Sequence, residues 1–316
     1  MKKDRIHRKF RIRYWWISIC VVLPGCARER QETPTKGHVT IAVSESISPL
    51  LRQEKQKFEE LYPEAVIDLQ VTTARDAIAS LFNDSLKVIV SSRPLNSEER
   101  DVQKKFHLAI DEYKIAIDGI AIIVNDENPV KGLRTTQLDS LLRGFTTRWD
   151  NVGWEHSSAA IDLCLPDQNS GTFEVVGMKI LHGERFATPT KIVHSSTTML
   201  EYVSSNTTAI GMVGINWIGE GNGKVRVLEL TDPNAPDSLG ISGQYFPPLQ
   251  AHLYRGYYPL TRDVFVYSRA DGYGVAAGFI SFMTSPAGQK IVLGTGLVPA
   301  TMPIRLVELT KRDIQQ

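Results

Sequence analysis

The sequence lacks the short motifs that mark the common hydrolases, proteases and nucleotide-binding enzymes. It contains no H-E-x-x-H, no G-x-S-x-G, no S-x-x-K and no P-loop lysine motif. Its seven histidines are far apart and form no local pattern of metal ligands: His7, His38, His107, His156, His182, His194 and His252. We therefore expect no catalytic residue, no cofactor and no metal, and a protein that is not an enzyme.

The N-terminus lacks a hydrophobic run long enough to span a membrane. The basic stretch MKKDRIHRKFRIRY precedes WWISICVVLPG, which is about half of the ~20 apolar residues that a transmembrane helix needs. This order is typical of a signal peptide, here residues 1–25. Leu23-Pro24-Gly25-Cys26 resembles the lipobox of bacterial lipoproteins, which implies cleavage before Cys26 and lipid attachment to that residue.

Cysteine is scarce, with three residues in the chain. Cys20 would leave with the signal peptide and Cys26 would carry the lipid, so Cys164 stands alone. An intramolecular disulfide and a thiolate metal cluster are thereby excluded. Cys164 lies in an apolar run and is expected to be buried in a strand.

The chain also lacks the excess of basic residues that nucleic-acid binding requires. Its formal net charge is +1, but residues 1–25 hold seven Lys and Arg against one acid, which leaves 29 basic and 34 acidic residues in 26–316. A mildly acidic body cannot neutralise a phosphate backbone without a basic face. We expect no nucleic-acid partner.

What the sequence does contain is a regular alternation of strands and helices. Residues 26–37 are polar and are interpreted as a linker from the lipid anchor to the folded part. Apolar patterning then predicts strands over 38–44, 65–71, 87–92, 118–125, 161–165, 209–213, 225–230 and 257–268. It predicts helices over 49–62, 74–84, 96–106, 135–143, 171–182, 197–205, 272–284 and 286–293. The pattern indicates an α/β fold in two blocks of mostly parallel sheet, with hinge strands around 119–125 and 260–268 and a ligand in the cleft between them.

Small hydroxyl residues follow several strands just before the next helix. They are Ser44, Ser46 and Ser48, then Thr72 and Thr73, then Ser91 and Ser92 with Arg93, and finally Ser170 and Thr172 around Gly171. A helix N-terminus offers free N–H groups and a partial positive charge, so several of them facing one cleft would hold an anion. Ser and Thr are also the ordinary caps of helices, and capping alone explains any single loop.

Several longer segments resemble the solute-binding proteins of phosphate ABC transporters, within the type II periplasmic binding protein superfamily. In chain order they are SSRPLNSEE, DGIAIIVNDENPV, LLRGFTTRWDNVG, NSGT, AIGMVGINWI, YYPLTRDVFVY and FMTSPAGQKIVLGTGLVP. The resemblance covers about residues 38–300. It implies two lobes, 38–122 plus 263–316 and 123–262, each a mostly parallel sheet flanked by helices and joined by two hinge strands.

The resemblance also implies the residues that hold the anion. Carried over by position, they are Ser46, Ile47, Thr73, Ser92, Ser170, Gly171 and Thr172.

Two positions depart from the family pattern. Ser92 stands where an Asp commonly accepts a hydrogen bond from protonated phosphate, and Pro166 stands where an Arg is common. Arg93 is a candidate replacement for that Arg through a bidentate contact with the anion; its alternative is a surface ion pair with Glu98 or Glu99. Weaker candidates are Arg75 as a donor, and Glu45 or Asp76 as an acceptor.

The sequence is therefore interpreted as an extracytoplasmic lipoprotein that captures inorganic phosphate for an ABC importer by lobe closure. Its expected partners are phosphate or a related oxyanion, a membrane permease, and a bacterial membrane reached through the lipid anchor on the periplasmic side of the cell envelope. The alternatives are a receptor for sulfate, molybdate or an organic phosphate, and a sensor or interaction lipoprotein with the same fold.

Overall fold

The computed structural model describes residues 32–155, 157–219 and 224–303. The predicted signal peptide, Cys26 and most of the predicted linker lie outside these residues. Within the described ranges, no helix is both long and apolar enough to cross a membrane. These ranges belong to one compact unit that begins at Glu32.

The first lobe contains a sheet whose first three strands are parallel and whose two strands nearest the second lobe come from later in the chain. Its strand order is β2-β1-β3-β11-β4, where β11 spans Thr261–Ser268 and β4 spans Asp111–Asn125. β1 pairs in parallel with both β2 and β3. The elements are β1 (Lys36–Ser44), α1 (Ser48–Leu61), β2 (Glu64–Thr72), α2 (Ala74–Phe82), β3 (Val88–Ser91) and α3 (Ser97–Lys105). The predicted capping box at the start of α3 is confirmed, since Asn96 and Glu99 each accept from the other's backbone N–H.

The second lobe repeats this plan around the far half of β4. Its strand order is β4-β8-β6-β7, and β6 pairs in parallel with both neighbours. Its strands are β5 (Gly132–Arg134), β6 (Asp162–Pro166), β7 (Lys191–Val193), β8 (Ala209–Gly214), β9 (Val225–Val227) and β10 (Glu229–Thr231). Its helices are α4 (Thr135–Leu142), α5 (Gly171–Lys179), α6 (Ser196–Ser205) and α7 (Gln250–Tyr254).

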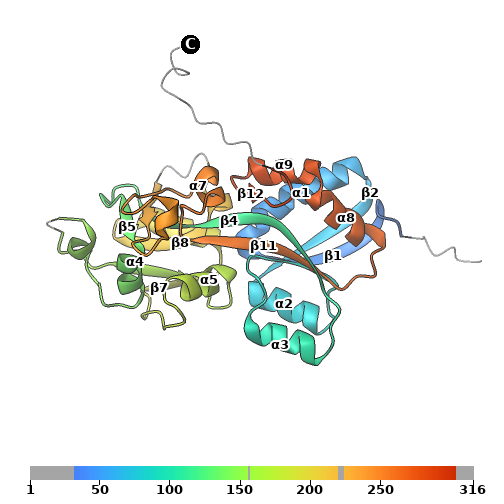
Figure 1. Ribbon diagram of the computed structural model, residues 1–316, viewed down its shortest axis with the longest axis horizontal. Helices are drawn as coiled ribbons and strands as arrows, with labels where there is room; N and C mark the ends of the chain where they lie inside the picture. The colour runs from blue at the N-terminus through green and yellow to red at the C-terminus, as the bar shows by residue number, and fades with distance from the viewer. Residues whose placement is uncertain (1–31, 156, 220–223, 304–316) are drawn as a thin grey trace, which may run out of the picture. The chain divides into compact units, whose positions relative to one another are not determined.

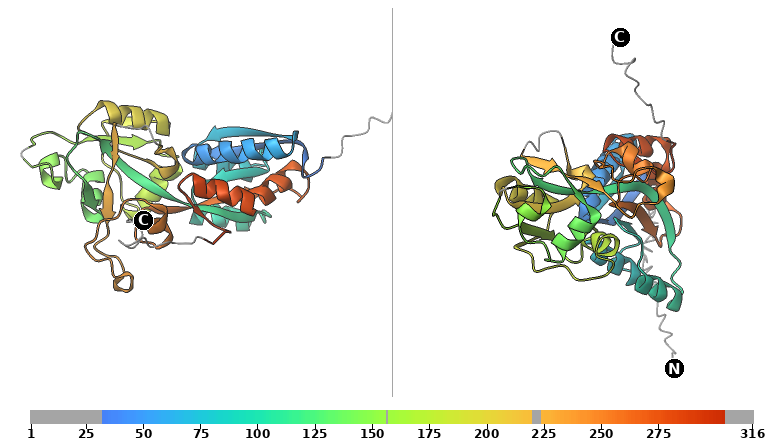
Figure 2. Two further views of the ribbon diagram at one scale, coloured as in Figure 1. Left: turned by 90° about the horizontal axis from the view of Figure 1, so that it is seen from above. Right: turned by 60° about the vertical axis from the view of Figure 1, so that its left-hand side comes forward.

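Two long strands connect the lobes. β4 (Asp111–Asn125) pairs along its first half with β11 (Thr261–Ser268) and along its second half with β8, so one strand belongs to both sheets. After β11 the chain returns to the first lobe through α8 (Gly274–Thr284), α9 (Pro286–Gly294) and β12 (Val298–Pro299), which pairs with β4. Both strands run between the two groups of helices in Figures 1 and 2. The predicted two-lobed α/β class is thus confirmed.

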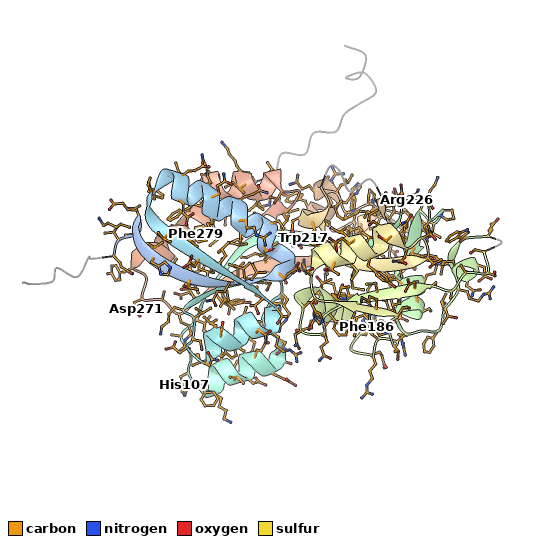
Figure 3. The ribbon with its side chains drawn as sticks, turned by 180° about the vertical axis from the view of Figure 1, so that it is seen from behind. His107, Phe186, Trp217, Arg226, Asp271 and Phe279 are labelled. Carbon is orange, nitrogen blue, oxygen red and sulfur yellow. The ribbon has the colours of Figure 1, made fainter. Side chains whose placement is uncertain are left out.

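The core follows the buried strands and the apolar faces of the helices. In the first lobe, Phe58 of α1 packs against Phe279 and Phe282 of α8, with ring centroids 5.3 and 5.5 Å apart. Figure 3 shows Phe279 among these helices, and Trp217 where the start of α1 meets the second lobe. Cys164 is fully buried in β6, as predicted.

The element boundaries differ from the prediction at a few places. The strand expected over 225–230 divides at Leu228, whose N–H donates to the carbonyl of Ile122, so β9 pairs with β4 and β10 pairs with β5. The helix expected over 171–182 ends at Lys179. Long-range pairing decides the strand boundary at Leu228, and no local sequence signal reports it.

Candidate functional site

A small cavity of about 280 Å³ lies between the two lobes. From the first lobe it is lined by Ser44, Glu45, Ser46, Val71, Thr72, Thr73 and Ala74. From the second it is lined by Pro166, Asp167, Ser170, Gly171, Thr172, Val193, His194, Ser195, Ser196, Met199 and Met212. Of the eight residues predicted to bind an anion, five line this cavity: Ser46, Thr73, Ser170, Gly171 and Thr172.

The first lobe presents the loops that follow β1 and β2. Ser46 lies in a short 3-10 turn after β1, and its hydroxyl donates to the Oγ of Ser92 over 2.9 Å. Thr73 caps α2 by accepting from the N–H of Asp76 over 3.1 Å, and its hydroxyl donates to the Asp76 carboxylate over 2.8 Å. Asp76 therefore serves the start of its own helix, and it is not among the cavity-lining residues.

The second lobe presents the start of α5. Ser170 caps this helix by accepting from the N–H of Phe173 over 3.1 Å, so it is both a cap and a cavity residue. A Cβ on Gly171 would lie 2.2 Å from the Oγ of Ser92 and 3.3 Å from the Cβ of Ala74. Glycine is required here because the two lobes touch at this point, whereas the sequence suggested that a ligand approaches there. Ser92 itself lies behind Gly171, fully buried and outside the cavity lining.

A buried arginine that the sequence did not single out stands behind Thr172. Arg262 of β11 donates to Thr172 Oγ1 over 2.8 Å, and through Nε and Nη2 to Asp118 Oδ2 over 2.8 and 2.6 Å. Burial raises the pKa of Asp118, and the guanidinium opposes that rise. Gly214 leaves room for this pair, because a Cβ there would lie 2.7 Å from Arg262 Nη2. Arg262 lies in the YPLTR segment and Asp118 in the DGI segment, but nothing in the sequence indicates that these two side chains meet.

One of the two carboxylates that line the cavity, Glu45, is held by hydrogen bonds from the opposite lobe. Glu45 accepts from the N–H of Ser196 over 2.8 Å and from its hydroxyl over 2.9 Å, so it occupies the N-terminus of α6. Burial raises the pKa of Glu45, and the bonds from Ser196 oppose that rise. Ser195 caps α6 and belongs to a further loop of small hydroxyl residues at a helix start. The same sequence pattern is present there, but the prediction of anion-binding residues did not include it.

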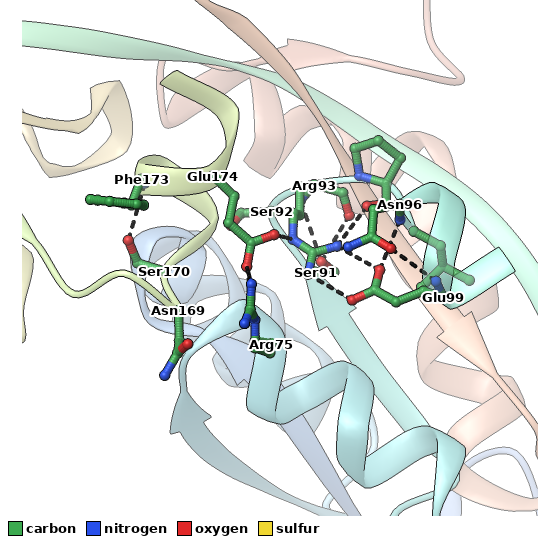
Figure 4. A network of polar contacts seen from close by, with 12 residues as sticks. Arg75, Ser91, Ser92, Arg93, Asn96, Glu99, Asn169, Ser170, Phe173 and Glu174 are labelled. Carbon is green, nitrogen blue, oxygen red and sulfur yellow. Dashed lines mark hydrogen bonds and ion pairs between the residues drawn. The ribbon is translucent and has the colours of Figure 1, made fainter. Parts of the chain in front are cut away.

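Arg93 and Ile47 do not reach the cavity. The Arg93 guanidinium makes a bidentate contact with Glu99, both bonds 2.8 Å, and its Nε lies 2.5 Å from Glu174 Oε2 (Figure 4). Glu99 is thus the partner named in the alternative interpretation, but the pair is not on the surface, because Arg93 is only 3% exposed. Ile47 is fully buried in the hydrophobic core. Pro166 lines the cavity, as its position in the family pattern suggested.

The described residues contain no cluster of His, Cys, Asp and Glu that would hold a metal ion. In the described part of the chain, no lysine or arginine lines the cavity either. Its polar character comes from hydroxyls, from the starts of α2, α5 and α6, and from the acids Glu45 and Asp167. Asp167 contacts the exposed ring of His194 over 2.9 Å. Such an arrangement suits a small ligand that accepts several hydrogen bonds.

The sequence of this chain is similar to those of known proteins. A model described as "PBP superfamily domain" matches residues 28–287. The protein SphX of Synechococcus elongatus is 23% identical over 267 residues, which span 83% of this chain and 77% of that protein. The phosphate-binding protein PstS of Staphylococcus saprophyticus is 25% identical over 254 residues, spanning 78% of this chain and 75% of that protein.

Solved structures share the fold. One from Clostridium perfringens, described as a phosphate ABC transporter substrate-binding protein with bound phosphate, has a TM-score of 0.72 at 22% identity and covers 84% of this chain and 100% of its own. An ABC-type phosphate transport receptor from Vibrio cholerae has a TM-score of 0.63 at 23% identity, with the same two coverages. With the family model matching more than four-fifths of the sequence, the chain belongs to the PBP superfamily.

Proposed function

We propose that this chain is an extracytoplasmic solute-binding protein that captures inorganic phosphate for an ABC importer and catalyses no reaction. The observation that carries the proposal is the small interlobe cavity lined by Ser46, Thr73, Ser170, Gly171 and Thr172. The relatives described as phosphate-binding proteins support the choice of ligand. Binding would hold the lobes together, because the lining comes from both of them.

The anion would be held mainly by neutral donors. The starts of α2 and α5 face the cavity, and each brings a partial positive charge together with N–H groups. Arg262 supports this side through Thr172 without lining the cavity itself. Arg93 and Ile47 take no part in the proposed site, and Ser92 acts only by orienting Ser46.

Glu45 is the proposed acceptor for a proton of the bound phosphate. It is the carboxylate candidate from the sequence that lines the cavity, whereas Asp76 binds Thr73. A buried carboxylate favours a ligand that brings a proton over a fully ionised one, so phosphate would be preferred to sulfate.

An organic phosphate is the second candidate, and one observation favours it. A wider groove of about 950 Å³ adjoins the cavity and shares Pro166, Asp167 and His194 with it. Phe173, Phe186, Met178 and Ile192 give that groove an apolar lining. A ligand with its phosphate in the cavity would place a small organic group there.

Calorimetry on the full-length chain in detergent tests both candidates. Phosphate, sulfate, molybdate and glycerol phosphate would be titrated between pH 5 and 9. Micromolar or tighter phosphate binding is expected, and binding of none of these oxyanions would overturn the proposal. Tighter binding of glycerol phosphate than of phosphate would favour the second candidate.

The lipid anchor at Cys26 is part of the same proposal, supported by the lipobox resemblance. It would hold the protein on the periplasmic side of a bacterial membrane, from which phosphate would pass to a permease. Replacing Cys26 with Ala should release the protein from the membrane fraction, and continued retention would contradict lipidation.

A further inference from the structure

A network of four charged side chains joins the lobes beside the cavity (Figure 4). Three of them belong to the first lobe: Arg75 in the first turn of α2, Arg93 just after β3, and Glu99 in α3. Glu174, in the first turn of α5, comes from the second lobe. With two cations and two carboxylates, the network is neutral as a whole.

The centre of the network is a buried contact between Arg93 and Glu174. Arg93 Nε lies 2.5 Å from Glu174 Oε2, with the two side chains 4% and 15% exposed. Glu99 accepts from both Nη atoms of Arg93, and Glu174 lies beside Nε as an ion pair rather than as a hydrogen-bond acceptor. Burial raises the pKa of Glu174, and both arginines oppose that rise by favouring its charged form.

Arg75 forms the outer edge of the network. Its Nε donates to Glu174 Oε1 over 3.3 Å, but its side chain is 57% exposed, so solvent screens this pair. Its backbone N–H also donates to the carbonyl of Asn169, over 3.3 Å. A backbone hydrogen bond thus joins the lobes outside the cavity lining as well.

We propose that Glu174 is a positioning residue, which with Arg93 and Arg75 forms an interlobe latch that holds the lobes closed over the cavity. Glu174 shares the first turn of α5 with Gly171 and Thr172, so the same bonds fix this helix start against the first lobe. The latch contributes no group to the lining of the cavity proposed for phosphate, although Arg75 and Glu174 line the adjoining groove. It acts on the ligand only through the fraction of molecules that is closed.

This coupling has a numerical consequence that rests on the proposed function. When only the closed form binds tightly, the apparent dissociation constant is the intrinsic one divided by the closed fraction. A variant with a broken latch should therefore lose phosphate affinity by the same factor by which its ligand-free closed fraction falls. We expect a factor of about five or more, because Arg93 would lose a buried partner.

Glu174→Gln in the full-length chain tests the latch, because glutamine keeps the size of the side chain and removes its charge. Fluorophores at Lys104 of α3 and Met178 of α5, inserted as genetically encoded amino acids, would report the interlobe distance in the absence of ligand. Calorimetry would give phosphate affinity. The matched control is Glu184→Gln, the same change at a glutamate whose nearest basic partner, Arg143 at 3.8 Å, is in its own lobe.

The expected result is a more open ligand-free protein and weaker phosphate binding in Glu174→Gln, with Glu184→Gln like the wild type. An unchanged ligand-free distance in Glu174→Gln would overturn the latch, even if affinity fell, since Glu174 would then act on the ligand directly. If neither the wild type nor any variant bound phosphate but the interlobe distance still increased in Glu174→Gln, the latch would be supported and the proposed ligand would be wrong. Arg75→Ala is a second, milder variant that should open the protein less.

Discussion

The cavity and the latch lie side by side between the same two lobes but differ in the side chains that form them. The cavity presents hydroxyls and helix starts, whereas the latch is made of Arg93, Arg75, Glu99 and Glu174. The buried arginines of the described residues, Arg93 and Arg262, are both neutralised by carboxylates of the protein. The two buried guanidinium groups thus stabilise the protein itself, and an anion in the cavity would be bound by neutral hydrogen-bond donors. Four substitutions test this division, from the largest expected effect to the smallest.

Gly171→Ala should disturb both the cavity and the latch, because Gly171 lines the cavity and shares the first turn of α5 with Glu174. The new Cβ would lie 2.2 Å from the Oγ of Ser92 and would push the start of α5 away from the first lobe. We expect phosphate affinity to fall at least a hundredfold, about 2.7 kcal/mol, by calorimetry. Gly294→Ala on α9, where a Cβ meets open space, is the control and should bind normally. Normal binding by the Gly171 variant would mean that lobe contact is not needed at this point.

Thr172→Val should damage the cavity while leaving the latch intact. It removes a hydroxyl from the lining and leaves Nη1 of the buried Arg262 without that acceptor. Leaving a buried donor unpaired costs about 1–3 kcal/mol of unfolding free energy. Denaturant unfolding should show this loss, and phosphate affinity should fall at least tenfold. Thr197→Val, at an exposed position of α6 outside the cavity lining, is the control; equal effects of the two variants would refute a special role for Thr172.

Glu45→Gln should change selectivity more than affinity. Because burial raises the pKa of Glu45, this carboxyl gains its charge at a higher pH than an ordinary glutamate. In the wild type, sulfate binding should therefore weaken as pH rises through that pKa, because an ionised carboxylate then faces a dianion. In the variant it should be flat between pH 5 and 8 and about tenfold tighter at pH 8, ~1.4 kcal/mol. An unchanged ratio of phosphate to sulfate affinity would remove Glu45 from selection.

Arg75→Ala should have the smallest effect, because its ion pair with Glu174 is largely exposed. Exposed pairs contribute about 0.2–1 kcal/mol, so the ligand-free closed fraction should change by roughly fivefold at most. The difference from wild type should shrink at 1 M salt, where screening is strong. An effect as large as that of Glu174→Gln would show that the buried pair with Arg93 is not the centre of the latch.

Much of the fold was predictable because local signals agree with the final packing. The alternation of apolar strands with helices, the capping box at Asn96 and the burial of Cys164 all follow from neighbouring residues. Most of the hydroxyl loops were also visible, since they lie at the start of a helix, whereas Ser91 and Ser92 precede the Asn96 cap of α3 by several residues. The division of 225–230 into two strands was not visible, because it depends on pairing with β4 and β5.

The candidate site was predictable only in part. The position of Arg93 in the chain shows a cation beside a hydroxyl loop, and a bidentate partner was expected. Its bidentate partner, Glu99, lies six residues away and is one of the two glutamates that the sequence suggested. Its second partner, Glu174, lies 81 residues further along and in the other lobe, and no local pattern indicates it. Arg262 and Asp118 are likewise joined only when β11 pairs with β4.

The sequence by itself determined the class of the fold, the crossing between two blocks, and the small polar residues at the helix starts. These features depend on periodicity, capping and turn chemistry, which act over a few residues. Tertiary structure decided which of these loops share one cavity, and it assigned the buried arginines to carboxylates of the protein. It alone could do so for Glu174 and Asp118, because a buried charge takes whichever partner the folded chain brings within a few ångströms, and these two carboxylates lie far from Arg93 and Arg262 in the sequence.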